Sequence, residues 1–100
     1  MPYSVQWSDQ ASDDVREWGV YVARQTSKQY ADELVQRLEQ EVREALGWSP
    51  QGYSPAPDWG EGVRRLPVLG RRVLFEVDEA QRVARILAVV GGAENPRDIR

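Results

Sequence analysis

The hydrophobic pattern of this chain changes period once, and this change limits its fold more than any other feature. Residues 9–46 repeat apolar side chains every three or four positions, as helices do, whereas residues 63–90 alternate with a period of two, as strands do. A short alternating run at residues 3–7 precedes the helical part. The pattern predicts an α+β fold in which two consecutive helices cover one face of a small, largely antiparallel sheet.

The sequence marks where both helices begin and end. The first is expected to start after Ser8 or Asp9, which can cap it, and to end near Gln25. The second follows a turn at residues 26–27 and is closed by Gly47. Because the turn between them is very short, the two helices are expected to form an antiparallel hairpin. Each carries one apolar stripe: Ala11, Val15, Trp18 and Val22 in the first, and Ala31, Leu34, Leu38, Val42 and Ala45 in the second.

Residues 47–60 are rich in glycine, serine and proline, which predicts an irregular loop. Its three aromatic side chains, Trp48, Tyr53 and Trp59, are too apolar for a freely moving linker. Two interpretations are open for them: they fold back onto the edge of the core, or they contact a partner protein.

Three strands are expected in the last forty residues, at 63–66, 72–77 and 83–90. Pro67 limits the first of them, and residues 78–81 form the turn between the other two. The complete order is therefore β-α-α-β-β-β. Residues 1–100 are expected to form a single domain, with residues 93–100 as a polar tail.

Both faces of the last predicted strand are apolar. Ala84, Ile86, Ala88 and Val90 suit one face, and Val83, Leu87 and Val89, together with Leu74 of the neighbouring strand, suit the other. Two helices can cover only one face, and each aliphatic side chain left in water forgoes about 1.5–3 kcal/mol. The second face, with Arg72 and Arg85 between its apolar residues, predicts a surface for a protein partner or a second copy. The alternative is that the tail or the 47–60 loop covers it.

Composition excludes several kinds of site. The chain has no cysteine and no histidine, which removes disulfides, Cys/His zinc sites and serine-type triads. The acidic residues at 76–79 indicate a solvated turn, so no metal and no cofactor is expected, and Asp13, Asp14 and Glu17 suit a helix dipole rather than paired catalysis. A net charge of −3 disfavours direct, sequence-specific DNA binding by this chain alone. No apolar run is long enough for a membrane span and no leader is recognisable, so a soluble, cytoplasmic protein is expected.

Several stretches carry a family resemblance: YSVQWSDQASDDVREWGVYVARQ at 3–25, ADELVQRLEQEV at 31–42, GVRRLP at 62–67, RVLFEVD at 72–78 and ARILAV at 84–89. With the order of elements, they resemble the RelE/ParE superfamily of toxins from bacterial type II toxin–antitoxin modules. The resemblance covers roughly residues 3–93. It implies a growth-inhibiting toxin, of the kind linked to plasmid stabilisation, that a cognate antitoxin neutralises. An extended or helical segment of the antitoxin is expected to lie across the sheet and the helices, with contacts on the uncovered sheet face at Leu74, Leu87, Val89, Arg72 and Arg85.

The resemblance implies two different activities. RelE-like members cut messenger RNA on the ribosome, which requires positive charge at the phosphorane and groups that move protons. Arg65 and Arg72 match the basic positions of the central strands, but residues 91–94 read Gly-Gly-Ala-Glu where many relatives carry His-Gly-Ala-Arg. The missing tail chemistry favours a ParE-like toxin, for which the resemblance implies DNA gyrase as target.

For such a toxin, Arg64, Arg65 and Arg97 are the expected target contacts. Two alternatives stay open: a ribosome-dependent endoribonuclease that uses Arg65 and Arg72, and a degenerate, non-toxic member kept for antitoxin binding. The paired arginines at 64–65 and 71–72 are equally consistent with edge-strand charges that prevent aggregation.

Overall fold

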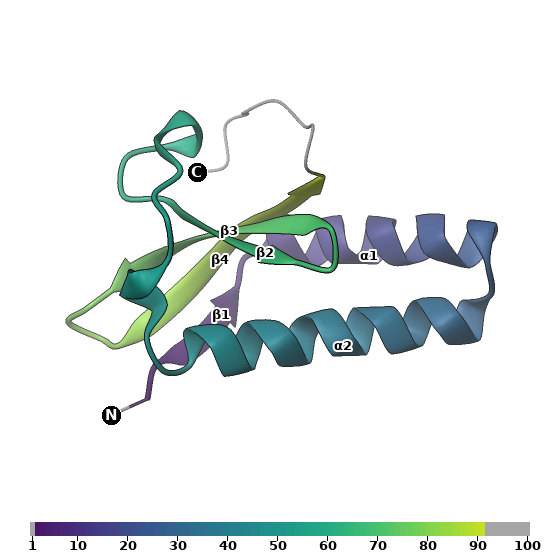
Figure 1. Ribbon diagram of the computed structural model, residues 1–100, viewed down its shortest axis with the longest axis horizontal. Coiled ribbons are helices and arrows are strands. Elements are labelled where there is room, and N and C mark those ends of the chain that lie inside the picture. Colours follow the sequence, from purple (N-terminus) through teal and green to yellow (C-terminus); the bar gives the residue numbers. More distant parts are fainter. Residues whose placement is uncertain (1, 92–100) are drawn as a thin grey trace.

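The computed structural model describes residues 2–91, which form one layer of helices against one sheet (Figure 1). The elements follow the order β1 (Ser4–Trp7), α1 (Asp9–Gln25), α2 (Lys28–Leu46), the 3₁₀ turns η1 (Pro50–Gly52) and η2 (Pro57–Trp59), β2 (Arg64–Val68), β3 (Arg71–Asp78) and β4 (Val83–Gly91). The predicted β-α-α-β-β-β order and the α+β fold class are confirmed. The predicted tail at 93–100 lies outside the described residues.

Both helices begin at serine caps. The Ser8 hydroxyl accepts the Ala11 N–H at 3.0 Å, and the Ser27 hydroxyl accepts the Tyr30 N–H at 3.1 Å. These bonds satisfy N–H groups that the first turn of a helix leaves without a partner. Gly47 ends α2 as predicted, with a φ of −69° that continues the helical conformation. Serine caps and a glycine stop therefore set the helix limits that the sequence predicts.

The sheet has the order β1-β4-β3-β2, in which β1 runs parallel to β4 and the other pairs are antiparallel. The prediction that the strand before Pro67 ends there is wrong, because β2 continues to Val68. A proline is tolerated in β2 because this strand lies at the sheet edge, where a missing N–H removes no ladder bond. Leu69 and Gly70, with φ of 50° and 77°, then form the two-residue turn into β3.

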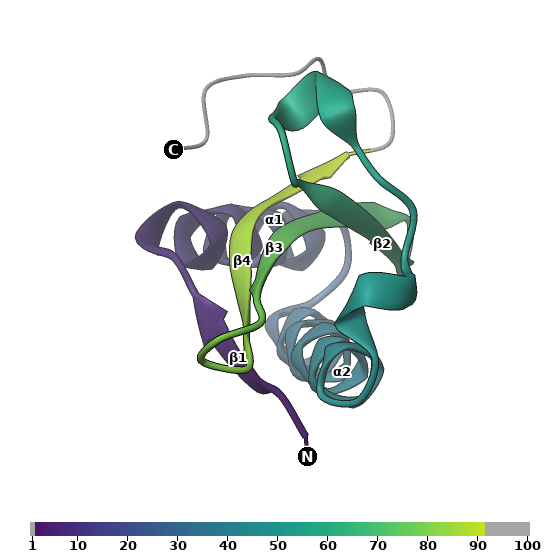
Figure 2. The same cartoon turned by 90° about the vertical axis from the view of Figure 1, so that its left-hand side faces the viewer.

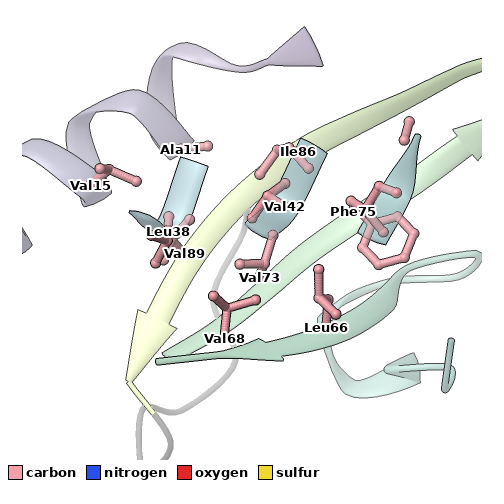
Figure 3. Close-up of a cluster of buried hydrophobic side chains, with 12 residues drawn as sticks. Ala11, Val15, Leu38, Val42, Leu66, Val68, Val73, Phe75, Ile86 and Val89 are labelled. Carbon is pink, nitrogen blue, oxygen red and sulfur yellow. The ribbon is translucent and has the colours of Figure 1, made fainter. Parts of the chain in front are cut away.

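The main core fills the space between the helices and the sheet, as Figure 3 shows. Helices α1 and α2 lie on the same side of the sheet (Figure 2), and contribute the apolar stripes that the sequence predicts. The buried members of this core are Ala11, Val15, Leu38, Val42, Leu46, Leu66, Val68, Val73, Phe75, Ala84, Ile86 and Val89.

The opposite face of the sheet is covered in part by residues 56–63, which we call the cap. Ala56, Trp59 and Val63 of the cap form a second buried cluster with Leu74, Leu87, Ala88 and Val90 of the sheet. The expectation of an uncovered apolar face is therefore wrong: the exposed fractions of Leu74, Leu87 and Val89 are 0%, 5% and 3%. The chain itself buries this surface, because the apolar loop residues gain more by packing on the sheet than by staying in water.

Strand β4 contains one extra residue, a β-bulge, in its pairing with β3. Leu74 of β3 pairs with Ala88, but the next residue, Phe75, pairs with Ile86, so that Leu87 has no partner in the register. Such a β-bulge lets two residues of one strand oppose one residue of the other.

The bulge reverses which side chains of β4 face the helices. Ala84 and Ile86, before it, and Val89, after it, belong to the main core (Figure 3). Ala88 and Val90 lie under the cap. The predicted division of this strand into even and odd faces is therefore wrong for Ala88, Val89 and Val90, because strict alternation assumes a regular ladder.

The start of α1 holds the bulge in place. The buried carboxylate of Asp14 accepts the Val89 N–H at 2.9 Å, and the Gln10 amide donates to the same carboxylate at 2.9 Å. The Ser8 hydroxyl, at 3.1 Å from the Leu87 carbonyl oxygen, donates to it. Asp14 is thus a structural acceptor rather than a solvated helix charge.

Candidate protein-binding surfaces

An open groove of about 960 Å³ lies between α1 and α2. Apart from Glu39, its less exposed lining is apolar, and the two helices contribute small or branched residues to it, namely Val15, Gly19 and Ala23 from α1 and Ala31 and Val35 from α2. Trp7 of β1 also lines it. A concave apolar surface along two helices has the shape and chemistry to receive another helix.

Gly19 sets how closely the two helices approach. A Cβ atom at this position would lie 3.1 Å from Cγ2 of Val35, closer than most side-chain contacts allow. The absence of a side chain at Gly19 therefore permits the close packing of α1 against α2.

The two rims of the groove carry different charges. Arg16 and Arg24 lie on the α1 rim, whereas Asp32 and Glu39 lie on the α2 rim. Lys28, near the helix turn, donates to Asp32 at 2.8 Å, and this hydrogen bond raises the pKa of Lys28 above its ordinary value. A ligand helix would meet mainly positive charge along one side and mainly negative charge along the other.

The sequence analysis did not identify this groove. Its signal is the spacing of small residues, Gly19 with Ala23 on one helix and Ala31 with Val35 on the other, four positions apart in each case. The predicted apolar stripes contain Ala31 but neither Gly19 nor Ala23, so they do not reveal a hollow between the helices. Val20, which also lines the groove, is 46% exposed although it is apolar.

A second hollow, of about 470 Å³, brings together two arginines that the sequence singled out. Arg65 of β2 and Arg72 of β3 line it with Tyr53 and Pro67, and Gly52 and Ser54 complete its wall. We call it the arginine cavity. It lies beside the cap, because the Arg72 guanidinium is 5.9 Å from the centre of the Trp59 ring, a cation–π distance.

Neighbouring contacts hold the wall of the arginine cavity. The Arg64 guanidinium donates to the Tyr53 carbonyl oxygen at 2.7 Å. The Tyr53 ring meets Phe75 edge to face, with 6.2 Å between the ring centres. The segment 54–56 pairs with the edge of β2, through bonds from Ala56 N–H to the Val63 carbonyl and from Arg65 N–H to the Ser54 carbonyl.

The remaining predicted contacts lie apart. Arg85 pairs with Glu76 on the sheet at 3.4 Å, away from the arginine cavity lining. Three of the predicted antitoxin contacts are buried and expose almost no surface to a partner protein: Leu74, Leu87 and Val89. Arg97 lies outside the described residues.

The three loop aromatics divide between the two interpretations. Trp59 belongs to the cap and is buried against the sheet, and Tyr53 packs on the core, so both fold back onto the molecule. Trp48 is 75% exposed, so its prediction as a partner contact stays open to test.

Within residues 2–91, no group of three or more carboxylates is arranged to hold a metal ion. Across the same part of the chain, neither helix combines the length and the apolar character that crossing a bilayer requires.

The fold and its surfaces define a RelE/ParE-type toxin domain, and comparison with known proteins supports this class. The family model described as ParE toxin of type II toxin-antitoxin system, parDE, matches residues 5–96. The chain therefore belongs to the ParE toxin family and is a toxin of a type II toxin–antitoxin system. A search of curated proteins gives no sequence match.

Solved structures share this fold at low sequence identity. The chromosomal ParDE system of P. aeruginosa matches with a TM-score of 0.73 and 20% identity, over 89% of this chain and 95% of that one. The RelBE2 toxin–antitoxin complex of Mycobacterium tuberculosis matches with a TM-score of 0.67 and 15% identity, over 91% and 99%. A free mutant of E. coli RelE matches with a TM-score of 0.64 and 14% identity, over 93% and 86%.

Proposed function

We propose that this toxin inhibits DNA gyrase and that a cognate antitoxin neutralises it. The observation that carries the proposal is the match of the ParE family model to nearly all of the chain. The lack of histidine anywhere in the sequence adds support, because the RelE-like tail chemistry is then incomplete. Action in the cytoplasm and plasmid stabilisation belong to the same proposal.

We propose further that the antitoxin places an amphipathic helix in the groove between α1 and α2. The apolar lining suits the apolar face of a helix, and the opposed charges of the rims suit a helix with an acidic edge toward α1 and a basic edge toward α2. This groove replaces the buried Leu74, Leu87 and Val89 as the proposed apolar contact. Arg72 and Arg85 remain proposed contacts for other parts of the antitoxin.

The gyrase proposal is tested with purified toxin and gyrase. Micromolar toxin is expected to stop DNA supercoiling, and expression in cells is expected to block growth and induce the DNA-damage response. Addition of an equimolar amount of antitoxin should restore supercoiling. Unchanged supercoiling at micromolar toxin would remove gyrase as the target.

The groove is tested with two variants matched in exposure. Val20 lines the groove and is 46% exposed, whereas Tyr30 lies outside its lining and is 47% exposed. Val20→Asp should weaken antitoxin binding at least tenfold, because it places a charge in an apolar contact, while Tyr30→Asp should change it less than twofold. Calorimetric titration measures both, and equal effects of the two substitutions would contradict the proposed site.

A second candidate function, messenger RNA cleavage on the ribosome, is favoured by one observation. Arg65 and Arg72 converge with Tyr53 in one cavity, which supplies positive charge and a hydroxyl-bearing side chain. Mapping of transcript ends after induction separates the candidates: cuts in phase with codons, lost in Arg72→Ala, would favour the endoribonuclease. Harmless overexpression would point instead to a degenerate member that retains antitoxin binding.

A further inference from the structure

We propose that the arginine cavity is a receptor for a single carboxylate side chain of the protein that this toxin inhibits. The inference rests on the proposed function in one respect, that the target is a protein. It assigns to the target a chemistry, an exposed glutamate or aspartate, and to the toxin the two guanidinium groups that would hold it.

The geometry of the cavity fits a carboxylate. Arg65 and Arg72 come from neighbouring strands. Pro67 pairs directly with Arg72, and Arg65, two residues before Pro67 in β2, lies on the same face of the sheet as both. A guanidinium group presents five N–H donors in a fixed plane and matches the two oxygens of a carboxylate. Within residues 2–91, Arg65 forms no ion pair, and its side chain is exposed at the cavity.

Arg72 is oriented before any ligand arrives. Its guanidinium lies over the Trp59 ring, and the side chain is half-buried against the cap. A stacked guanidinium loses less freedom on binding than a mobile one, which increases the affinity of each hydrogen bond that it makes. The contact with Trp59 uses the face of the guanidinium plane, whereas its N–H donors lie in the plane.

Charge around the cavity favours a protein over a nucleic acid. The whole chain has a net charge of −3, and nucleic-acid binding draws on a broad excess of lysine and arginine. On the same sheet, Glu76 pairs with Arg85 and neutralises the next basic position. Asp58 and Glu61 lie in and beside η2, within two residues of Trp59. Two guanidinium groups in an acidic molecule suit one carboxylate rather than a chain of phosphates.

The arginine cavity is separate from the proposed antitoxin groove. No residue lines both: the groove is built by α1, α2 and Trp7, and the cavity by residues of β2, β3 and the loop before the cap. Substitution of Arg65 is therefore expected to affect the target contact without weakening the antitoxin helix contact.

The first test uses small probes and the intact toxin, so that it does not depend on the identity of the target. N-acetylglutamate methylamide is titrated into ¹⁵N-labelled protein, with N-acetylglutamine methylamide as the uncharged match and inorganic phosphate as the competing anion. Saturable shifts are expected at the Arg65 and Tyr53 amides with the carboxylate and not with the amide. Arg65→Gln should weaken the carboxylate binding at least fivefold, whereas Arg43→Gln, an exposed position on α2 outside both hollows, should leave it unchanged.

Two results of this titration would overturn the proposal. One is the absence of saturable shifts with the carboxylate, or shifts of equal size at arginines elsewhere on the surface. The other is tighter binding of phosphate than of carboxylate at the same residues, which would assign the cavity to a nucleic-acid backbone.

The second test connects the cavity with inhibition. Arg65→Glu should raise the toxin concentration for half-inhibition of supercoiling at least tenfold, because it turns attraction into repulsion. Retained potency in a folded Arg65→Glu variant would contradict the role in target binding. If wild-type toxin leaves supercoiling unchanged, the gyrase proposal fails, and the probe titration still decides whether the cavity binds carboxylates.

Discussion

Asp14 of α1 contacts the backbone of β4 at the point where the facing of its side chains changes. Its carboxylate accepts the Val89 N–H just beyond the extra residue Leu87, where the regular ladder is interrupted. A buried N–H without an acceptor destabilises a protein by about 1–3 kcal/mol, so the carboxylate makes the bulge tolerable. One acidic side chain, at a position where a solvated charge was expected, thus satisfies the backbone of β4 at Val89, the residue that faces the core beyond the bulge.

We predict that Asp14→Ala lowers the free energy of unfolding by about 1–3 kcal/mol, because Val89 N–H loses its acceptor. Asp14→Asn retains an oxygen acceptor and should be less destabilising. Urea denaturation measures the stability, and amide hydrogen exchange at Val89 reports the local loss. Asp13→Ala, an exposed neighbour that pairs with Arg16, is the control and should stay within about 0.5 kcal/mol. Wild-type exchange at Val89 in Asp14→Ala would show that another group holds the bulge.

The cap gives this small sheet a second layer. Its residues are mostly irregular, yet Trp59 and Val63 bury Leu74 and Leu87 on the face opposite the helices. Figure 2 shows the η2 segment on the side of the sheet away from α2. The molecule thus buries both faces of its central strands with only two helices, and the cap supplies the remaining cover.

We predict that Trp59→Ala costs about 3–5 kcal/mol of stability, because it removes the largest side chain of the cap and uncovers the apolar residues beneath. Binding of the dye ANS should increase in the same variant. Trp48→Ala is the matched control: the same side chain is 75% exposed there, and its loss should change stability by less than about 0.5 kcal/mol. Equal losses of stability in Trp59→Ala and Trp48→Ala would contradict a stabilising role of the cap.

At the scale of the whole molecule, Tyr3 joins segments that are far apart in sequence. Its hydroxyl donates to Glu79 at 2.8 Å in the β3–β4 turn and accepts from Gln51 at 3.3 Å in η1. Its N–H donates to the Gly47 carbonyl at the end of α2, and the Arg82 guanidinium lies over its ring. Tyr3 therefore connects the segment before β1 with the end of α2, with η1 and with the β3–β4 turn.

We predict that the hydrogen bond from the Tyr3 hydroxyl to Glu79 is lost at high pH. The hydrogen bond to Glu79 raises the pKa of Tyr3 above its ordinary value of 10.0, because the neutral phenol is the donor. A group whose pKa is raised in the folded state contributes its full stabilisation at a pH below its unfolded-state pKa. This stabilisation is lost as the pH rises through the pKa of the folded state. Thermal melts from pH 8 upward should show a loss of stability above pH 10 that is smaller in Tyr3→Phe. Identical pH profiles of the two proteins would contradict this role.

Much of the fold depends on interactions between residues close together in the sequence, and such interactions can be predicted from the sequence. Serine caps at Ser8 and Ser27 and the stop at Gly47 depend on neighbours within four residues, so their positions could be predicted. The bulge at Leu87 could not, since its acceptor, Asp14, lies far away in the chain. The cap was one of two open alternatives, because apolar residues in a loop do not reveal which surface they cover.

The candidate surfaces could be predicted only in part. Arg65 and Arg72 were identified by resemblance, and they do line one cavity. The groove was not predicted because Gly19 and Ala23 lie outside the predicted apolar stripes, and only the packing of the two helices shows that these residues line a hollow.

The first strand of the sheet has the last strand as its hydrogen-bonded neighbour: Ser4 aligns with Val83, and Trp7 aligns with Ile86. During translation, β1 therefore emerges from the ribosome long before the strand that it needs. A growing chain that ends before residue 83 has neither the central strand nor the acceptors for β1, so it cannot assemble the sheet. The sheet can thus be completed only after β4, at residues 83–91, has left the ribosome, although β1 is the first element to be made.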